Sequence, residues 1–583
     1  MIRDFKKVLI LALVIVMALS TASFAITTTS TKAPVVDHKT TYSINVFTMV
    51  GNYSGEQTGW GAKILKDKFN MKLNIISSNV EGGGDTKFAT MMASGNLGDL
   101  VILGSDTDGK YDDAIKAGML LDWNKNNLIG KYAPYITENF PKAIQKNTTN
   151  HGKGKAVYGI GHNVTDPYNS GSSEGKDMTE HSDFRFDLYQ KIGSPVMNTF
   201  EDMLPVLQKM QKLEPKSETG KPTYGFTFWK DWDGNMMMYT KAFTALMGYD
   251  EGDGYNDGGF IQFNPDGTSY GCLDPNGPYI RVLKLFNKAN QLGLVDPDSI
   301  SQTFDDVMNK YKDGQILFCL FPWLDNMYNT DEKQKQGKGF QFVPIGGEKV
   351  ISYAFNPYGD VRTIAIGSKA KQPERIMELI NWLYTPQGAE TYYYGPQGLT
   401  WDLDKNNKPV RTAFGKQALP NNPVQVPANW GGGTFKDGVI QLNFEPVNRN
   451  GINPYYGEPY NFELWTSELI YNPTKLVQNW RKTYGALTAK EYVVKNDLLV
   501  LKKTVYTGKA PEERSELLKQ KQGQVATIIK DYSWKCVFSK NDTEFNSLIK
   551  EMTTKAKGLG YDEVLKWNMD HAKQVQAFLK SQK

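Results

Sequence analysis

YSINVF at residues 42–47, KLNII at 72–76 and LVIL at 100–103 are the stretches that decide the fold. The first two alternate apolar and polar residues as strands do, and the third reads as a short buried strand. Between them, residues 61–69 and 86–93 have the apolar spacing of helices. Strands that alternate with helices predict an α/β fold with a mainly parallel sheet. Ligands approach such a sheet at the carboxyl ends of its strands.

The length of the chain predicts more than one lobe. Its 583 residues exceed the size at which a single hydrophobic core keeps growing. A polar, glycine-rich region at 152–179 interrupts the early pattern, and helices prevail after it. Strand-like runs return at 314–320 and 362–366, and a helix is predicted at 374–384. We therefore expect the chain to re-enter its first lobe.

The first 25 residues have the pattern of a signal peptide. A basic start precedes an apolar run at residues 8–19, and Ser23-Phe24-Ala25 fits a small-x-small cleavage site. The alternative is a permanent membrane anchor, but the run is shorter than the ~20 residues that a spanning helix needs. Residues 26–41 are rich in threonine and read as a flexible leader. The sequence thus predicts export to the extracellular side of the membrane.

Composition argues against several classes of function. The net charge is only +4 and no dense Lys/Arg run occurs, so nucleic-acid binding is not expected. The three cysteines form no C-x-x-C pair, so neither a zinc ribbon nor a redox site is expected. No zinc-protease, serine-hydrolase or P-loop motif occurs, so we expect no catalytic residues, metal or cofactor. A facing pair of carboxylates, as in a glycosidase, stays open among 63 acidic residues.

Several short motifs follow one another in a recognisable order. KFATMMASGNLGDLV at 87–101 is the longest of them, and AGMLLD at 117–122, GLVDP at 293–297, KQPE at 371–374 and YTPQG at 384–388 follow it. This order resembles the family 1 extracellular solute-binding proteins, especially the long lipoproteins of oligosaccharide and aldouronate uptake.

The resemblance implies a periplasmic-binding-protein-like fold, in which two α/β lobes with a hinge close over a central ligand cleft. It implies a carbohydrate ligand, an oligosaccharide, that a monomeric receptor delivers to the permease subunits of an ABC transporter. We expect lobe 1 at about 42–155 and 350–400, and lobe 2 at about 156–349 and 401–583.

Two features depart from the family pattern. Relatives from Gram-positive bacteria carry a cysteine directly after the signal for lipid attachment, whereas the first cysteine here is Cys272. Relatives also often hold an acidic, calcium-binding loop, because calcium needs several oxygen ligands at regular spacing. The matching segment, residues 214–223, contains Lys216 and Lys221 instead. Neither a lipid anchor nor calcium at this loop is expected.

Sugar sites pair aromatic platforms with planar polar side chains, and this combination recurs in several predicted loops. The alternatives are a self-packed loop after the first strand, a helix N-cap for Asp233, core positions for the tryptophans, and simple turns elsewhere. The candidate ligand-binding residues are Asn52, Tyr53, Glu56, Trp60, Trp229, Trp232, Asp233, Trp323, Asp325, Asn356, Tyr358, Trp430, Arg449 and Tyr456.

Two other functions remain compatible with this sequence. A surface sugar sensor or adhesin would use the same lobes without a permease, and the missing lipidation cysteine keeps that alternative open. A secreted carbohydrate-active enzyme is the other, since a carboxylate pair cannot be recognised from sequence.

Overall fold

A six-stranded sheet in the order β2-β3-β1-β4-β12-β5 organises the first part of the molecule. β1 (Tyr42–Thr48) pairs in parallel with β3 (Met71–Ser77) and β4 (Leu100–Leu103). β12 (Thr363–Ile366) adds to β4 in the antiparallel sense and also pairs with β5 (Gly159–Gly161). The predicted strand–helix alternation is confirmed, and so is the later return of the chain to this sheet.

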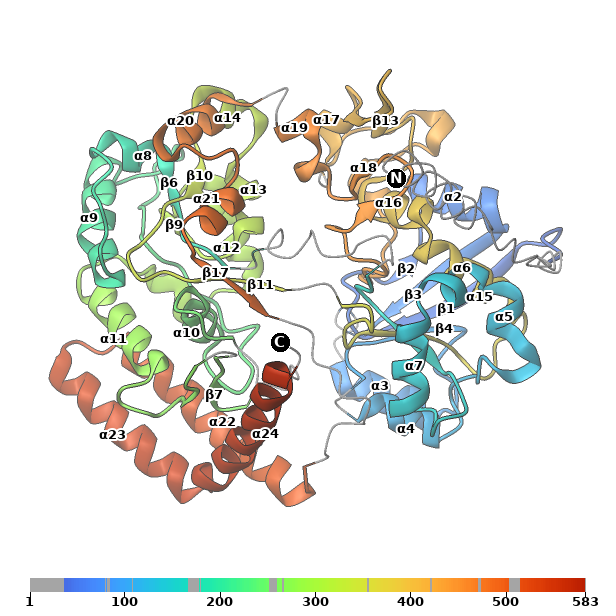
Figure 1. Ribbon diagram of the computed structural model, residues 1–583, viewed down its shortest axis with the longest axis horizontal. Coiled ribbons are helices and arrows are strands. Elements are labelled where there is room, and N and C mark those ends of the chain that lie inside the picture. The colour runs from blue at the N-terminus through green and yellow to red at the C-terminus, as the bar shows by residue number, and fades with distance from the viewer. Residues whose placement is uncertain are drawn as a thin grey trace, which may run out of the picture. The chain divides into compact units, whose positions relative to one another are not determined.

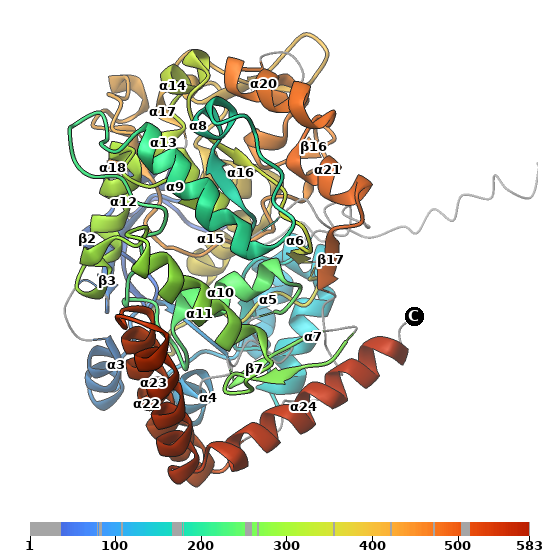
Figure 2. The ribbon, with the colours of Figure 1, turned by 90° about the vertical axis from the view of Figure 1, so that its left-hand side faces the viewer.

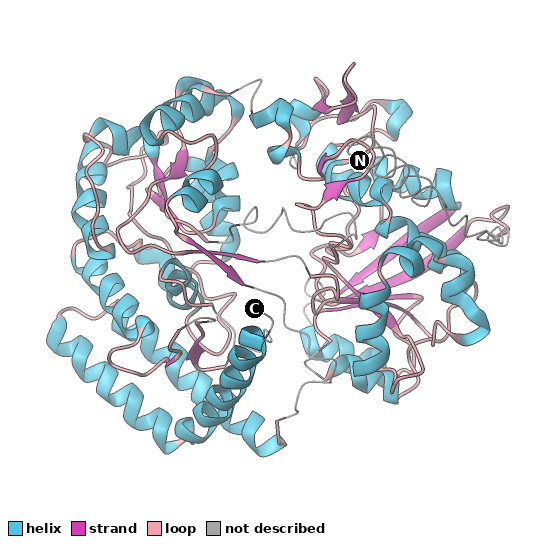
Figure 3. Cartoon of the chain, viewed as in Figure 1, coloured by secondary structure: helices cyan, strands magenta, loops and turns pink. Residues whose placement is uncertain are grey.

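The computed structural model describes residues 36–78, 80, 84–106, 109–165, 178, 180–250, 259–264, 267–353, 356–419, 422–469, 473–502 and 514–581. The predicted signal peptide and most of the predicted leader lie outside them. We call the described residues of 38–165 and 356–469 lobe 1, and those of 178–353 and 473–581 lobe 2. Figure 3 shows the strands of the main sheet together in lobe 1, whereas helices prevail in lobe 2.

Apolar side chains cover both faces of the main sheet. Ile44, Val46 and Ile102 belong to the large core on one face, and Phe47 and Val101 to a smaller core on the other. Parallel strands are buried on both faces in this way when helices cover them. The elements of lobe 1 are completed by β2 (Gly55–Glu56), α2 (Gly59–Phe69), α3 (Gly84–Ala93), α4 (Lys110–Lys116), α5 (Leu128–Tyr132), α6 (Pro134–Asn139), α7 (Pro141–Asn150), α15 (Pro373–Tyr384), α16 (Pro386–Tyr394), β13 (Trp401–Leu403), β14 (Pro409–Arg411), α17 (Gly415–Ala418), η6 (Ala428–Trp430), α18 (Phe435–Gly438), β15 (Ile452–Asn453), β16 (Glu458–Pro459), η7 (Phe462–Leu464) and α19 (Thr466–Leu469).

Lobe 2 is built around one large aromatic-rich core beside a three-stranded sheet, β10-β6-β9. Its long C-terminal helices α22, α23 and α24 lie in the lower half of the molecule in Figure 2, and α22 packs against α11. The elements are β6 (Asp183–Arg185), α8 (Phe186–Lys191), α9 (Met203–Leu213), α10 (Met238–Phe243), β7 (Ile261–Gln262), β8 (Tyr270–Gly271), α11 (Pro278–Gln291), η4 (Pro297–Ile300), α12 (Phe304–Asp313), β9 (Phe318–Cys319), η5 (Pro322–Leu324), α13 (Asp325–Tyr328), α14 (Asp331–Gln336), β10 (Phe340–Phe342), β11 (Val350–Tyr353), α20 (Lys475–Tyr484), α21 (Ala489–Lys495), β17 (Leu499–Lys502), α22 (Glu516–Val537), α23 (Asp542–Gly558) and α24 (Tyr561–Ser581).

The structure corrects the lobe boundaries expected from the sequence. Trp401 and Trp465 lie in the core of the main sheet, so residues 401–469 belong to lobe 1. β11 pairs in parallel with β17 instead, which places residues 350–353 in lobe 2. The expected boundaries followed changes in local pattern, whereas these assignments depend on contacts between distant segments.

Along the described residues the chain changes lobe three times, after Thr165, after Tyr353 and after Leu469, and Figure 1 shows the two lobes that these residues belong to. The first two passages are bonded to each other at both ends. In lobe 1 the Thr165 amide donates to the Asn356 carbonyl at 3.1 Å, and in lobe 2 Met178 forms an antiparallel bridge with Ser352.

Arg375 joins α15 to the turn between α2 and β3. Its side chain is 1% exposed and donates to the carbonyls of Phe69 at 2.7 Å, Asn70 at 3.1 Å and Thr40 at 3.0 Å. Asn70, at φ 46°, has the left-handed conformation that ends α2. One guanidinium thus holds three backbone segments together.

Replacing Arg375 by alanine should lower the free energy of unfolding by about 2–4 kcal/mol, because buried carbonyls lose their donors. Arg375→Lys should recover little of this, since one ammonium cannot replace a planar fork of donors. Urea unfolding followed by circular dichroism measures the change, with exposed Lys369→Ala as the control. Equal midpoints for Arg375→Ala and the control would contradict this role.

Candidate functional site

Three aromatic side chains form a cluster on lobe 2 that we call the aromatic platform: Trp232, Phe304 and Trp323. The ring centroid of Trp232 lies 4.4 Å from that of Phe304 and 5.9 Å from that of Trp323. Trp232 is 44% exposed and Trp323 is 37% exposed. A cluster of exposed aromatic side chains is a candidate for a site of interaction.

The loop that carries Trp232 is held by the start of α12. The amide of Phe304 donates to Asp231 Oδ2 at 2.8 Å, which brings the neighbouring Trp232 over the Phe304 ring. Gln302 Nε2 donates to the Phe228 carbonyl at 2.7 Å, so the backbone that leads into the loop is also fixed. α12 itself begins with a capping box at Thr303. The platform is therefore preorganised by hydrogen bonds that lie behind it.

Two buried aromatic rings support the platform from within lobe 2. Trp229 is fully buried and meets Trp232 edge-on, with centroids 5.2 Å apart and planes at 80°. Phe321 lies 6.0 Å from Trp229 and 5.8 Å from Trp323. The sequence placed Trp229 in the ligand site, whereas the structure makes it a core residue with no face left for a ligand.

Asp325 follows Trp323 by two residues but points into the protein. It is 7% exposed and lies near Asp183, whose Oδ1 is 2.8 Å from His181 Nδ1. Burial, reinforced by the negative charge of Asp183, raises the pKa of Asp325 well above its usual value. The expectation that Asp325 contacts ligand is therefore corrected, because the short helix α13 turns its side chain inward.

A hydrogen bond connects the platform side of lobe 2 with lobe 1. Asn326 Nδ2, three residues after Trp323, donates to Glu463 Oε1 at 3.4 Å. Glu463 lies in η7, and its neighbour Phe462 belongs to the core of lobe 1. Lobe 1 thus reaches the edge of lobe 2 on which Trp323 lies.

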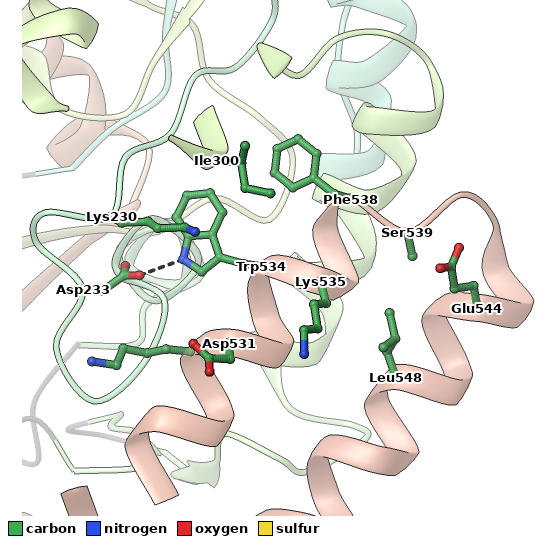
Figure 4. A pocket seen from close by; sticks show the side chains of 11 residues that line it. Lys230, Asp233, Ile300, Asp531, Trp534, Lys535, Phe538, Ser539, Glu544 and Leu548 are labelled. Atoms are coloured by element: carbon green, nitrogen blue, oxygen red, sulfur yellow. Dashed lines mark hydrogen bonds between the residues drawn. The ribbon is translucent and has the colours of Figure 1, made fainter. Parts of the chain in front are cut away.

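The other side of the Trp232 loop lines a cavity of about 690 Å³ against α22 (Figure 4). Asp233 accepts hydrogen bonds from the Met238 amide and from Trp534 Nε1, both at 2.7 Å. Burial raises the pKa of this carboxyl. Lys230 lies over the Trp534 ring, 5.0 Å from its centroid. Asp233 thus holds the first amide of α10 and anchors α22, although the N-cap position of α10 is Met237 and not Asp233.

The four candidates after β1 do not form one site. Asn52 is exposed, and Tyr53 donates its hydroxyl to the Glu56 carbonyl at 2.7 Å. The Glu56 carboxylate pairs with Lys72 at 2.9 Å. Trp60 is 1% exposed, donates to the Phe435 carbonyl at 2.9 Å and stacks on that ring. Trp60 is thus a core residue, because α2 begins immediately before it and turns it inward.

The remaining candidates occupy lobe 1. Asn356 closes a turn through hydrogen bonds to the Gly359 carbonyl at 3.0 Å and to Asp360 Oδ1 at 2.9 Å. Tyr358 is half-buried and has Lys142 over its ring. Trp430 and Tyr456 line a separate cavity. Arg449 is half-buried, and its carbonyl accepts from the Asn461 amide at 2.7 Å.

Sequence reasoning missed Phe304, the third ring of the platform. Thr303 and Asp306 form a capping box, a pattern that marks a helix start in sequence and could have located Phe304 at its first residue. Nothing in the local sequence indicates that this helix start lies under Trp232.

Comparison with known proteins identifies the fold. Neither a family model nor a curated protein matches the chain. Among solved structures, the alginate-binding protein AlgQ2 without calcium aligns with a TM-score of 0.60 and 16% identity over 92% of this chain and 98% of that one. The Streptococcus pneumoniae ABC-transporter substrate-binding protein FusA, in complex with kestose, gives 0.59 and 16% over 92% and 99%.

A solute-binding protein of Bifidobacterium longum infantis, described as HMO-binding and ABC-transporter-associated, gives a TM-score of 0.53 and 14% identity over 91% of this chain and 98% of that one. The chain therefore has the two-lobed, periplasmic-binding-protein-like fold of these proteins. In the part of the chain that the structure describes, no helix combines the length and apolar character needed to cross a membrane.

The two neighbouring tryptophans of the Trp232 loop should respond differently to truncation. Trp229→Ala should lower the free energy of unfolding by about 3–5 kcal/mol, because it empties a core position. Trp232→Ala should cost less than about 1 kcal/mol, because its ring is already partly hydrated. Chemical denaturation of both variants measures the difference. Similar losses would contradict the division between core and platform.

Proposed function

We propose that this chain is an extracellular solute-binding protein of family 1, the receptor component of an ABC importer, and that its ligand is an oligosaccharide. The observation that carries the proposal is the aromatic platform, two exposed tryptophans around Phe304 at the edge of lobe 2 that lobe 1 reaches. Solved proteins of the same fold include one in complex with kestose and one described as alginate-binding.

An oligosaccharide fits the chemistry of the platform. The C–H faces of a pyranose or furanose ring are apolar, and they stack on indole and phenyl faces while the hydroxyl groups stay hydrogen-bonded. Trp232 and Trp323 are both exposed and their ring centroids lie 5.9 Å apart, so each indole can contact a different sugar unit. This supports a ligand of more than one unit.

Capture would work by closure of the two lobes. Contacts from both lobes exist only when they close, so ligand binding shifts the equilibrium toward the closed form. Thr165 bonds to Asn356 and Met178 bridges to Ser352 beside the first two connections, where a hinge would be fixed. The Asn326–Glu463 hydrogen bond joins the two lobes. A permease then recognises the closed shape. We further propose that the protein is a monomer, that the predicted signal peptide exports it, and that it acts without catalysis.

A thermal-shift screen of the purified mature protein against neutral and acidic oligosaccharides tests this function. A ligand that binds only the folded state, at about 100 times its Kd, should add about 2.7 kcal/mol of stability and raise the Tm. Trp232→Ala and Trp323→Ala should each reduce this shift, whereas the exposed Val196→Ala should keep it.

Two results would contradict the proposal. The first is no response to any sugar alongside a clear response to peptides or nucleotides. The second is release of reducing ends from the bound oligosaccharide, which would favour a carbohydrate-active enzyme.

A further inference from the structure

A second cavity, of about 930 Å³, lies entirely within lobe 1. Its walls come from α2, α16, η6, the β13 strand and the turn between β15 and β16. No residue that the structure describes in lobe 2 lines it, so the walls seen here belong to one lobe alone. The residues that matter for its chemistry are Glu390, Trp401, Trp430, Asn453, Tyr455 and Tyr456.

Aromatic side chains form one side of this cavity. Tyr455 is 67% exposed, while Trp401 is 8% exposed and meets Tyr456 edge-on at 5.9 Å. Trp401 Nε1 donates to the Gly395 carbonyl at 3.2 Å, which fixes the orientation of its ring. Trp430 is half-buried, beside the glycines that follow it. The cavity therefore presents fixed aromatic rings inside and a freely accessible one, Tyr455.

Glu390 is a buried carboxyl with an unused oxygen. It is 1% exposed, and its Oε2 accepts hydrogen bonds from the Tyr456 hydroxyl at 2.6 Å and from Asn453 Nδ2 at 3.3 Å. Its Oε1 has no hydrogen-bond partner among the described residues. A buried polar atom left without a partner costs free energy. A ligand that reached Oε1 would recover this energy.

The charges around the cavity favour a neutral ligand. Asp67 and Asp402 line it with a single cation, Lys68, which donates to Gln387 Oε1 at 3.1 Å. Burial raises the pKa of Glu390 to about 8, so its carboxyl keeps a proton at neutral pH. A protonated carboxyl both donates and accepts, as hydroxyl groups do. An anionic ligand would meet two carboxylates and only one ammonium.

We propose that this cavity, the lobe 1 pocket, is a second binding site that takes a neutral saccharide, with its sugar ring against Tyr455 and Trp430 and a hydroxyl on Glu390 Oε1. It does not rest on the function proposed for the aromatic platform. Because one lobe forms it, it binds equally in open and closed forms. A sugar chain held here would raise the local concentration of the same chain near the protein.

The test uses the mature protein with the platform removed, Trp232→Ala/Trp323→Ala, and with 5-fluorotryptophan incorporated for ¹⁹F NMR. The probes are neutral malto-, xylo-, manno- and fructo-oligosaccharides at about 10 mM, ten times a Kd of about 1 mM. At least one should shift the Trp430 resonance, assigned with Trp430→Phe, in a saturable manner. A Trp430 resonance that none of them moves would overturn the proposal.

Further variants in the same background separate binding from folding. Tyr455→Ala changes a mostly exposed side chain and should weaken binding about tenfold, whereas Val80→Ala, also exposed in lobe 1, should not. Glu390→Gln keeps a donor and an acceptor and should bind, while Glu390→Leu should not. Equal affinities for Tyr455→Ala and its parent, or for the two Glu390 variants, would overturn the assignment.

Discussion

The structure depends on the backbone pairing of the first two passages between the lobes. The Thr165–Asn356 hydrogen bond and the Met178–Ser352 bridge tie these passages together, one on each side. Each lobe has its own hydrophobic core, so neither needs the other to bury its apolar side chains. Lobes that are packed separately are able to move as rigid bodies relative to each other. The fold therefore favours binding by closure over binding in a single rigid pocket.

The aromatic platform depends in turn on long-range support within lobe 2. Its loop contacts the start of α12 through Asp231 and the C-terminal helix α22 through Asp233. The contact through Asp231 joins residues 73 positions apart, and the contact through Asp233 joins residues 301 positions apart. The long C-terminal segment is thus part of what positions Trp232, and not an appendage.

The sequence predicts local structure better than it predicts which side chains share a site. Alternation at 42–47 and 72–76 located β1 and β3, because one buried face imposes a period of two. The same local reasoning could not decide whether Trp60, Trp229 and Trp232 face inward, since each lies near the start of a helix or turn. The pairing of β11 with β17 joins residues about 150 positions apart. Local sequence patterns do not reveal such a contact, so they could not locate the lobe boundary at this strand.

The distance between the lobes, measured with and without sugar, tests the central claim most directly. Spin labels at Lys131→Cys in α5 and Lys209→Cys in α9 would report one lobe each, and both sites are exposed. The native Cys272, Cys319 and Cys536 are all buried, so the labels should attach at the engineered sites. Pulsed electron paramagnetic resonance should show a shorter and narrower distance distribution once an oligosaccharide identified by thermal shift is added. An unchanged distribution with that sugar bound would contradict capture by closure of the two lobes.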